Sequence, residues 1–312
     1  MVNMFMNFIS LIVLILIVFI GIAFLTLLER KILSYIQNRK GPNKVGFLGI
    51  FQPFSEALKL FSKELIMIIK SNFILYYLSP IMSMVLLLFI WMNYNFYLNL
   101  FYINYSILMI ILILSMNSYM IMLMGWASNS LYSMIGAIRS VAQVLSYEVS
   151  FIMILLIQMI LSESYSLMDL IKWQKYLWFF WMLFPLMIIF FISILSELNR
   201  SPMDFIEGES ELVSGFNVEF FSGSFALIFL SEYGMIIFMS YLLMYLYLGS
   251  SSIYMQFLLM NLIIMSIIFM RGILPRMRYD ELMYLCWKII LPMILNYLLY
   301  FFMFKEFFLL KN

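Results

Sequence analysis

Histidine is absent from the 312-residue sequence, and Cys286 is its single cysteine. Zinc, haem and iron–sulfur sites depend on clusters of His or Cys, and a disulfide needs a second cysteine. The sequence therefore predicts a chain that binds no metal or redox cofactor through its own ligands. Redox chemistry in which it takes part must use a diffusible substrate or a cofactor held by a partner.

Charge is also scarce. Only 11% of the residues are charged, 65% are hydrophobic, and the mean hydropathy is +1.04, whereas a soluble domain has about 25% charged residues. This composition excludes a soluble domain and predicts an all-α, polytopic membrane protein. The few bases are scattered at the ends of apolar runs, so we expect no nucleic-acid partner. Abundant Phe, Ile, Met and Tyr with little Ala and Gly is a usage typical of an AT-rich mitochondrial genome.

Apolar runs of about 20 residues are long enough to span a bilayer, and they predict about eight spans in one helical domain over residues 1–312. We expect them at about residues 8–28, 74–93, 105–126, 141–161, 176–196, 224–248, 255–271 and 286–304. Four bases (Lys172, Lys175, Lys305 and Lys311) then lie on one side of the membrane and the other 14 on the opposite side. The positive-inside rule places the basic side inside and both termini outside.

Between the first two spans, residues at about 50–65 have the pattern of an amphipathic helix. Phe54, Leu58, Phe61 and Leu65 share one face, and polar residues take the other. Such a helix lies in the membrane interface. It is either a surface anchor or a lid over a cavity that opens inward.

The most distinctive stretch is an acidic loop at about residues 197–223. Together with the start of the next span it holds seven of the 16 acids and one base, Arg200. The acids are Glu197, Asp204, Glu207, Glu209, Glu211, Glu219 and Glu232. They alternate with Phe, Ile, Leu and Val, and desolvation disfavours the charged form of a carboxylate beside apolar surface. We therefore expect groups that exchange protons near neutral pH; the alternative is an acidic loop that binds water or a basic partner.

Two acids are predicted inside spans: Glu148 in the fourth and Glu232 in the sixth. An intramembrane charge costs at least roughly 2.5–3.5 kcal/mol on insertion scales, so such residues are functional by default. Tyr147 and Tyr233 adjoin them and extend a possible hydrogen-bonded chain. The alternative is a structural acid paired with a base or a tyrosine. Because neither span carries Lys or Arg in its apolar part, we expect no local ion pair.

Two basic segments are predicted on the inner side: ERKILSYIQNRKGPNKVG at residues 29–46 and RGILPRMRYD at residues 271–280. Their bases either serve membrane orientation alone, or Arg30, Arg39, Arg276 and Arg278 pair with the acidic stretch or line an opening. The residues themselves leave both interpretations open.

These segments, with QPFSEALKLFSKE, SYEVS, SELNRSPMDFIEGESELVSGFNVEF and RGILPRMRYDELMYLCWK, resemble the subunit 1 family of mitochondrial NADH:ubiquinone oxidoreductase, respiratory complex I. The resemblance covers essentially the whole chain, and with the AT-rich usage it favours an insect or similar invertebrate source.

The resemblance implies a core membrane subunit in the mitochondrial inner membrane, with its main charged loops on the matrix side and both termini on the intermembrane-space side. It would form most of the ubiquinone chamber, while FMN and the iron–sulfur clusters belong to partner subunits. Its implied partners are the quinone-site subunits of the peripheral arm, small membrane subunits that lead to antiporter-like subunits, and membrane lipids. The residues implied at the chamber and junction are Arg30, Arg39, Glu56, Arg276, Arg278 and Asp280.

The same resemblance assigns the acids named above, with Glu148, to a relay between the quinone chamber and proton channels. Quinone reduction would shift charge in the chamber, the acidic stretch would change its protonation, and Glu148 and Glu232 would pass that change into the membrane arm. Two other classes stay open at this point. A stand-alone proton-coupled transporter would use the same acids, and a structural anchor would have no use for Glu148 and Glu232.

Overall fold

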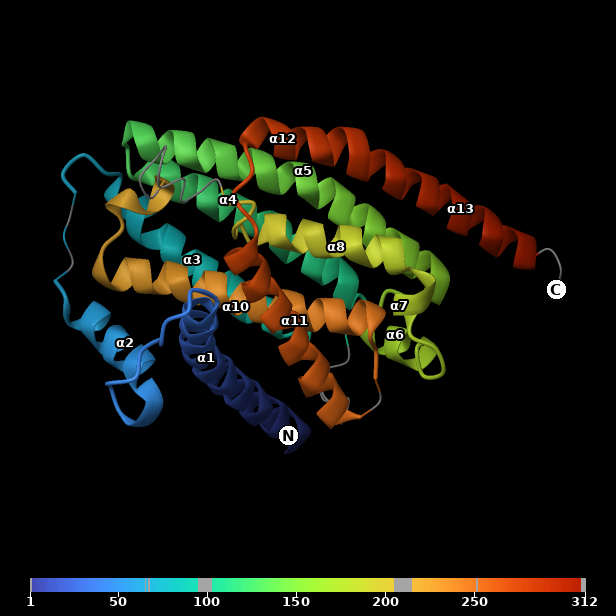
Figure 1. Cartoon of the computed structure of the whole chain (residues 1–312), viewed down its shortest axis with the longest axis horizontal. Coiled ribbons are helices and arrows are strands. Elements are labelled where there is room, and N and C mark those ends of the chain that lie inside the picture. Colours follow the sequence, from blue (N-terminus) through green and yellow to red (C-terminus); the bar gives the residue numbers. More distant parts are fainter. Residues whose placement is uncertain are drawn as a thin grey trace.

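The computed structural model describes residues 2–64, 66, 68–94, 103–204, 215–250 and 252–309, and these form a helical bundle (Figure 1). No strand occurs in these ranges. In a bilayer every backbone N–H and C=O must find a partner inside the protein, and an α-helix provides these partners within one segment. The expected all-α, polytopic fold is confirmed.

Seven helical segments are long and apolar enough to cross a membrane. They are α1 (Val2–Ile36), α3 (Phe73–Trp91), α4 (Ser106–Ala127), α5 (Leu131–Ser162), α10 (Ser222–Tyr247), α11 (Ile253–Ile273), and the run of α12 (Tyr279–Tyr284), the π-helical η3 (Leu285–Ile290) and α13 (Leu291–Leu309). α5 begins ten residues before the expected span, because Arg139 and Ser140 interrupt the mostly apolar sequence of its first turns.

The region expected as a fifth span is divided. A short α6 (Leu167–Trp173) is followed by α7 (Phe179–Met182) and α8 (Phe184–Glu197), with a break at Leu183. Pro185 lies in the first turn of α8, where its missing N–H costs no helical hydrogen bond. The 14 residues of α8 reach about 21 Å at about 1.5 Å per residue, less than the roughly 30 Å of hydrocarbon in a bilayer. Glu197 ends this short helix.

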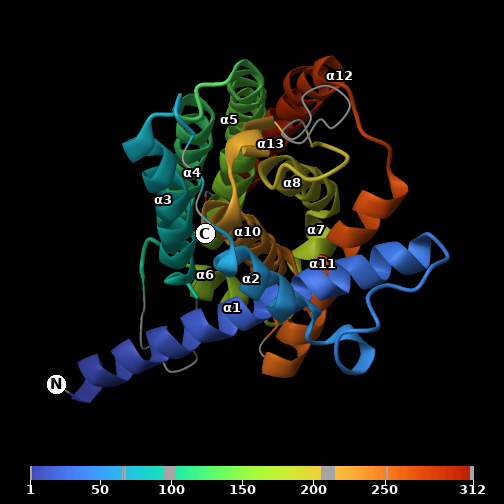
Figure 2. The ribbon, with the colours of Figure 1, turned by 90° about the vertical axis from the view of Figure 1, so that its left-hand side faces the viewer.

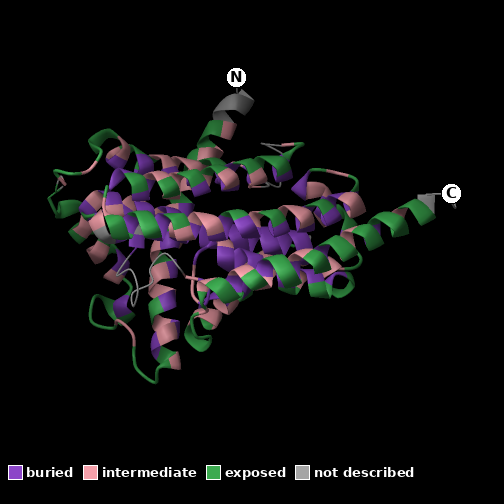
Figure 3. Ribbon diagram, turned by 90° about the horizontal axis from the view of Figure 1, so that it is seen from above, coloured by how far each residue is buried: buried purple, intermediate pink, exposed green. Residues whose placement is uncertain are grey.

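The centre of the bundle is α10. Every residue from Tyr233 to Tyr247 is buried, and α10 contacts α1, α2, α3 and α11. A second group of contacts surrounds α5, which packs against α4, α8 and α13. Figure 3 shows the buried residues along the middle of the bundle and exposed residues along the outer helices and the C-terminal end of α13.

The amphipathic helix α2 (Gln52–Ser62) follows a short 3₁₀ turn, η1 (Phe47–Gly49). Phe54, Leu58 and Phe61 of α2 are exposed. α2 and the α4–α5 turn lie at one end of the bundle, whereas α6, α7 and the C-terminus lie at the other (Figure 1). α1 crosses the bundle obliquely (Figure 2) and contacts α2, α10 and α11.

Candidate functional site

A charged cluster of Glu29, Arg200, Glu232, Tyr233 and Arg271 lies where α1, α10 and α11 meet the segment after α8. Glu29, near the end of α1, is only 5% exposed. Tyr233 donates a hydrogen bond of 2.6 Å to Glu29 Oε2, and Arg271 donates one to Oε1. One carboxylate of α1 thus joins α10 and α11, whose bonding residues lie 204 and 242 positions later in the sequence.

Arg200 connects Glu29 to a second carboxylate. Its Nη1 lies 3.8 Å from Glu29 Oε1, and its Nη2 lies 3.8 Å from Glu232 Oε2. The guanidinium also stands 4.5 Å from the centre of the Tyr233 ring, within the range of a cation–π interaction. The prediction that no ion pair forms at Glu232 is wrong. The base comes from the segment after α8, so a search of the spans alone does not find it.

The charges of this cluster cancel. Two carboxylates face two guanidiniums, and burying an ion costs several kcal/mol unless a partner compensates it. The arrangement therefore allows ionised groups inside the bundle, and the loss of any one of the four charged groups leaves another charge without compensation.

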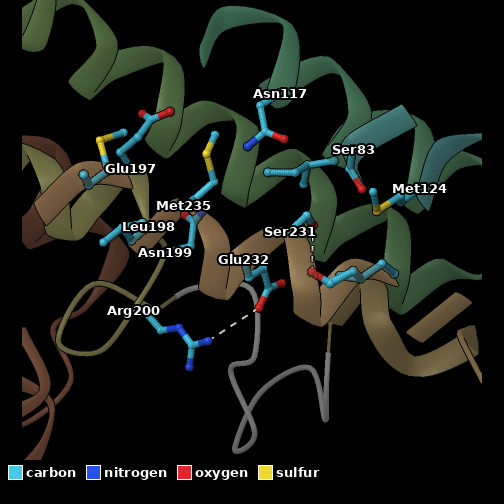
Figure 4. A pocket seen from close by; sticks show the side chains of 13 residues that line it. Ser83, Asn117, Met124, Glu197, Leu198, Asn199, Arg200, Ser231, Glu232 and Met235 are labelled. Carbon is cyan, nitrogen blue, oxygen red and sulfur yellow. Dashed lines mark hydrogen bonds and ion pairs between the residues drawn. The ribbon is translucent and has the colours of Figure 1, made fainter. Parts of the chain in front are cut away.

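Beyond Arg200 the side chains line a polar pocket (Figure 4). Its polar lining consists of Ser83, Asn117, Glu197, Asn199, Arg200, Ser231 and Glu232, and its apolar lining comes from α4, α10 and the segment after α8. The hydroxyls of Ser83 and Ser231 donate to carbonyls of their own helices. Their oxygen lone pairs remain available to accept hydrogen bonds. The pocket is thus suited to hold water between Glu197 and Glu232.

Glu148 of α5 is the next acid beyond Glu197, and the charges of these two carboxylates act on one another. Glu29, Glu232, Glu197 and Glu148 therefore follow one another across the bundle from α1 to α5. Arg200 lies between the first two, and the polar pocket between the second and third.

At the α2 end, Glu56 ties the amphipathic helix to α1. Arg30 donates to both oxygens of Glu56, with 2.7 Å between Nη2 and Oε2, and Gln52 donates to Oε1 at 2.6 Å. Partial burial alone would raise the pKa of Glu56, but the hydrogen bonds from Arg30 and Gln52 outweigh it and hold the pKa below its ordinary value. The Phe24 and Phe54 rings meet edge to face, 6.0 Å apart, beside this pair.

The remaining bases singled out from the sequence lie in two loops. Arg39 lines a second pocket together with Arg30, Lys40 and the Gly41–Pro42 turn. Arg276 and Arg278 lie between α11 and α12, where the backbone N–H of Met277 donates to the carbonyl of Pro202. This bond holds the basic segment against the start of the acidic loop. Asp280 lies in the first turn of α12.

Other predicted relay residues have different surroundings. Tyr147 donates to the Leu282 carbonyl at 3.2 Å, so its hydroxyl ties α5 to α12. The carbonyl of Glu219, at the end of η2 (Gly215–Glu219), accepts a hydrogen bond from Tyr76 of α3. Asp204 is the last described residue before the central part of the acidic loop. Glu207, Glu209 and Glu211 lie outside the described residues.

Sequence reasoning did not assign seven residues to the site: Glu29, Ser83, Asn117, Asn199, Arg200, Ser231 and Arg271. Arg200 was noted only as the single base of the acidic loop. Glu29 and Arg271 appear in the sequence as charges that end an apolar run, so nothing marks them as partners. Asn117 did carry a signal, because it is an amide near the middle of an apolar run. Asn199 follows Glu197 closely, and its place in the pocket depends on the chain turning after α8.

Among the residues that the structure describes, no group of three or more His, Cys, Asp or Glu side chains is arranged to hold a metal ion. Cys286 is buried and directs its thiol to the Ser146 carbonyl at 3.3 Å. What the described residues do offer is a row of carboxylates that begins in a charge-balanced cluster and continues past a pocket with polar side chains.

Comparison with known proteins relates the chain to a family. A family model described as NADH dehydrogenase matches residues 9–302. The chain is 52% identical to NADH-ubiquinone oxidoreductase chain 1 of Aedes aegypti, covering 95% of each chain. It is 50% identical to the same protein of Anopheles gambiae, covering 97% of each, and 49% identical to that of Locusta migratoria, covering 96% of each. With a match that runs from the first span to the last, the chain belongs to the NADH dehydrogenase family.

Proposed function

We propose that this chain is the membrane subunit of NADH:ubiquinone oxidoreductase that admits ubiquinone to the enzyme and couples its reduction to proton translocation. The names of its relatives support the enzyme. The observation that carries the coupling role is the row of Glu29, Glu232, Glu197 and Glu148 from α1 to α5, joined by Arg200 and the polar pocket.

The entry for ubiquinone lies beside α1, α2 and α11. The exposed apolar side chains of α2 suit a helix in the membrane interface, where an isoprenoid quinone dissolved in the bilayer can pass. The Arg30–Glu56 pair and the Glu29–Arg271 pair follow inward from α2 and α1. They supply the polar contacts that a quinone ring needs after its tail has crossed the apolar entrance.

The coupling step follows from charge balance. Ubiquinone becomes ubiquinol by gaining two electrons and two protons, so its reduction draws protons toward the charged cluster. A change in the charge of Glu29 alters its attraction for Arg200, and through Arg200 it alters the electrostatic environment of Glu232. The pocket carries the change to Glu197, and Glu148 passes it to the outer face of α5. Partner subunits hold FMN and the iron–sulfur clusters, and small membrane subunits lead from α5 to antiporter-like subunits.

The end of the bundle with α2 faces the matrix, and both termini face the intermembrane space. The bases of residues 29–70 lie at the α2 end, as the positive-inside rule requires. Arg39, Arg276 and Arg278 then face the peripheral arm, which carries electrons to the quinone.

The proposal is tested by Glu197→Gln and Glu232→Gln in the assembled enzyme in membranes. Glu163→Gln is the control, because Glu163 pairs with Lys305 at the opposite end and is mostly exposed. NADH:ferricyanide activity should persist in all three variants. Protons pumped per NADH, or the coupled ubiquinone reductase rate, should fall about tenfold or more in the first two, as expected when a positioned proton-transfer group is lost. Unchanged rates and stoichiometry in both would refute the relay.

A further inference from the structure

Asn117 is a polar side chain at the middle of an apolar helix. In α4, eleven residues precede it and ten follow. Its amide therefore lies near the midplane of the span, where a polar group without a partner is costly. A residue in this position needs a hydrogen-bonding partner or a function that compensates for the cost.

The Asn117 side chain points into the polar pocket from the α4 side, while Glu197 and Glu232 line the pocket from α8 and α10 (Figure 4). Within the described part of the chain, no hydrogen bond joins the Asn117 amide to either carboxylate or to any other residue. The neighbouring Ser118 behaves differently, because its hydroxyl donates to the Ser115 carbonyl of its own helix. Asn117 is thus not serving as a helix-to-helix contact.

The chemistry of the pocket identifies the missing partner. An asparagine amide offers two N–H donors and one acceptor oxygen, and it does not titrate in the physiological range. The carboxylates accept, and the hydroxyls of Ser83 and Ser231 present only lone pairs to the pocket. A molecule that both donates and accepts completes this set, and water is the ordinary occupant of such a site.

We propose that Asn117 is a positioning residue that holds a water in the short chain of waters through which Glu197 and Glu232 exchange a proton. This water accepts from the amide; a proton that leaves one carboxyl group enters the chain at one end as another proton leaves the other end for the second carboxylate. No atom is gained or lost in this exchange. The inference rests on the proposed relay and adds the residue that fixes its geometry across the pocket.

The test uses Asn117→Leu in the assembled, membrane-bound enzyme, because leucine keeps the number and branching of the side-chain heavy atoms and removes every hydrogen-bonding atom. Ile121→Leu, another lining residue of α4, controls for a change of shape. Asn117→Ser is the rescue, since a hydroxyl can hold the same water. The measurements are NADH:ferricyanide activity, coupled ubiquinone reduction, protons pumped per NADH, and the ratio of rates in H2O and D2O.

With Asn117→Leu, ferricyanide activity should stay normal while coupled turnover falls about tenfold, which corresponds to about 1.4 kcal/mol. The H2O/D2O ratio should rise, because proton transfer across the pocket becomes rate-limiting. Asn117→Ser should recover most of the rate, and Ile121→Leu should match the wild type. A purely structural role would not change the isotope effect.

Wild-type turnover and isotope effect in Asn117→Leu would overturn the inference. If Glu197→Gln and Glu232→Gln abolish coupling in the same membranes while Asn117→Leu does not, only the role of Asn117 fails. If none of the three has an effect, the relay itself fails. Should Asn117→Leu not assemble, Asn117→Ala gives the same comparison. Failure of both to assemble would also overturn the inference, because a residue that only holds water is not needed for folding.

Discussion

Arg200 contacts three side chains of the charged cluster: it stands between Glu29 and Glu232 and over the ring of Tyr233. Arginine suits this position because its planar guanidinium presents donors in two directions and stacks on an aromatic face. A lysine ammonium offers a compact charge without the fork or the plane. Stability at this site therefore depends on the shape of the cation as well as on its charge.

Arg200→Met should destabilise the solubilised assembly by a few kcal/mol, because removing one partner of a buried ion pair leaves the other charge uncompensated. Arg200→Lys should lie between Arg200→Met and the wild type. The midpoints of thermal denaturation of the purified assemblies give the order of stability of the wild type, Arg200→Lys and Arg200→Met. A midpoint for Arg200→Met equal to the wild-type value would contradict the charge balance described for the cluster.

The Arg30–Glu56 pair gives a prediction about pH. The pKa of Glu56 is lowered in the folded chain, so its stabilising contribution is fully present above the ordinary carboxyl pKa of about 4.3. The contribution is lost as the pH falls through the lowered value. The attachment of α2 to α1 should therefore be constant from pH 8 to about pH 5.

A spin label on Leu58→Cys can report this attachment, because Leu58 is exposed and the native cysteine is buried. Its mobility should rise only below the ordinary carboxyl pKa. The same label in a Glu56→Gln background should be mobile throughout. A rise in mobility between pH 6 and 8 in the otherwise unaltered chain would contradict the assignment.

The sequence identified several individual carboxylates of the row but not their partners. Glu148, Glu197 and Glu232 stand out because acids are rare in apolar runs. Glu29 and Arg271 are 242 positions apart and look like ordinary span ends, so only the packing of α1 beside α11 reveals their pairing. A single sequence contains no direct signal of such a contact.

At the level of elements, most of the apolar runs coincide with long helices, because a bilayer requires about 20 apolar residues in a helix. Apolar length does not show the division into α7 and α8, where the apolar composition continues through a break in the helix. It also does not show the start of α5, because Arg139 and Ser140 interrupt the mostly apolar sequence of its first turns. The length and composition of an apolar run predict which segment can cross the hydrocarbon of a bilayer. They do not predict where the helix begins and ends, because helix ends depend on local backbone geometry.

The α4–α5 contact depends on the absence of a side chain. A Cβ at Gly125 would lie 2.2 Å from Ala137 Cβ and 3.0 Å from the Ser133 carbonyl oxygen. Gly125→Ala should therefore force the helices apart and cost about 1–3 kcal/mol, as overpacking does. Gly21→Ala is the matched control, because its nearest neighbour would be Ile237 Cδ1 at 3.6 Å, an ordinary contact.

Thermal denaturation and the yield of assembled enzyme measure this difference. We expect Gly21→Ala to equal or exceed the wild type, since alanine favours a helix over glycine by up to about 1 kcal/mol. Equal stability of the two alanine variants would show that α4 and α5 are not in the close contact described here.

On the scale of the whole molecule, the bundle has two chemically different ends and an apolar circumference. α1, α11 and α13 carry exposed apolar side chains along their length. A membrane or neighbouring membrane subunits must cover this surface, because no soluble monomer exposes so much of it. Composition alone predicted an apolar outer surface. The order of the acids across the bundle can be known only from the arrangement of the helices.

The proposed orientation can be measured by labelling lysines from each side of sealed membranes. An impermeant amine reagent applied to the intermembrane-space face should modify Lys172, whose side chain is 74% exposed, but not Lys63 of the segment after α2. In inside-out vesicles the pattern should reverse. Permeabilised membranes give the maximum labelling of each lysine, and modification of Lys63 from the intermembrane-space face would invert the orientation.

Arg200 stands 3.8 Å from both Glu29 and Glu232, so two carboxylates share one cation at equal distance. A shift of the guanidinium toward one carboxylate weakens its hold on the other, since the Coulomb energy falls with distance. In the proposed relay, proton gain at one of the two carboxylates and proton release at the other would then accompany a single displacement of Arg200. The total charge of the cluster would stay constant, and a proton would cross the bundle without exposing a net charge to the surrounding lipid.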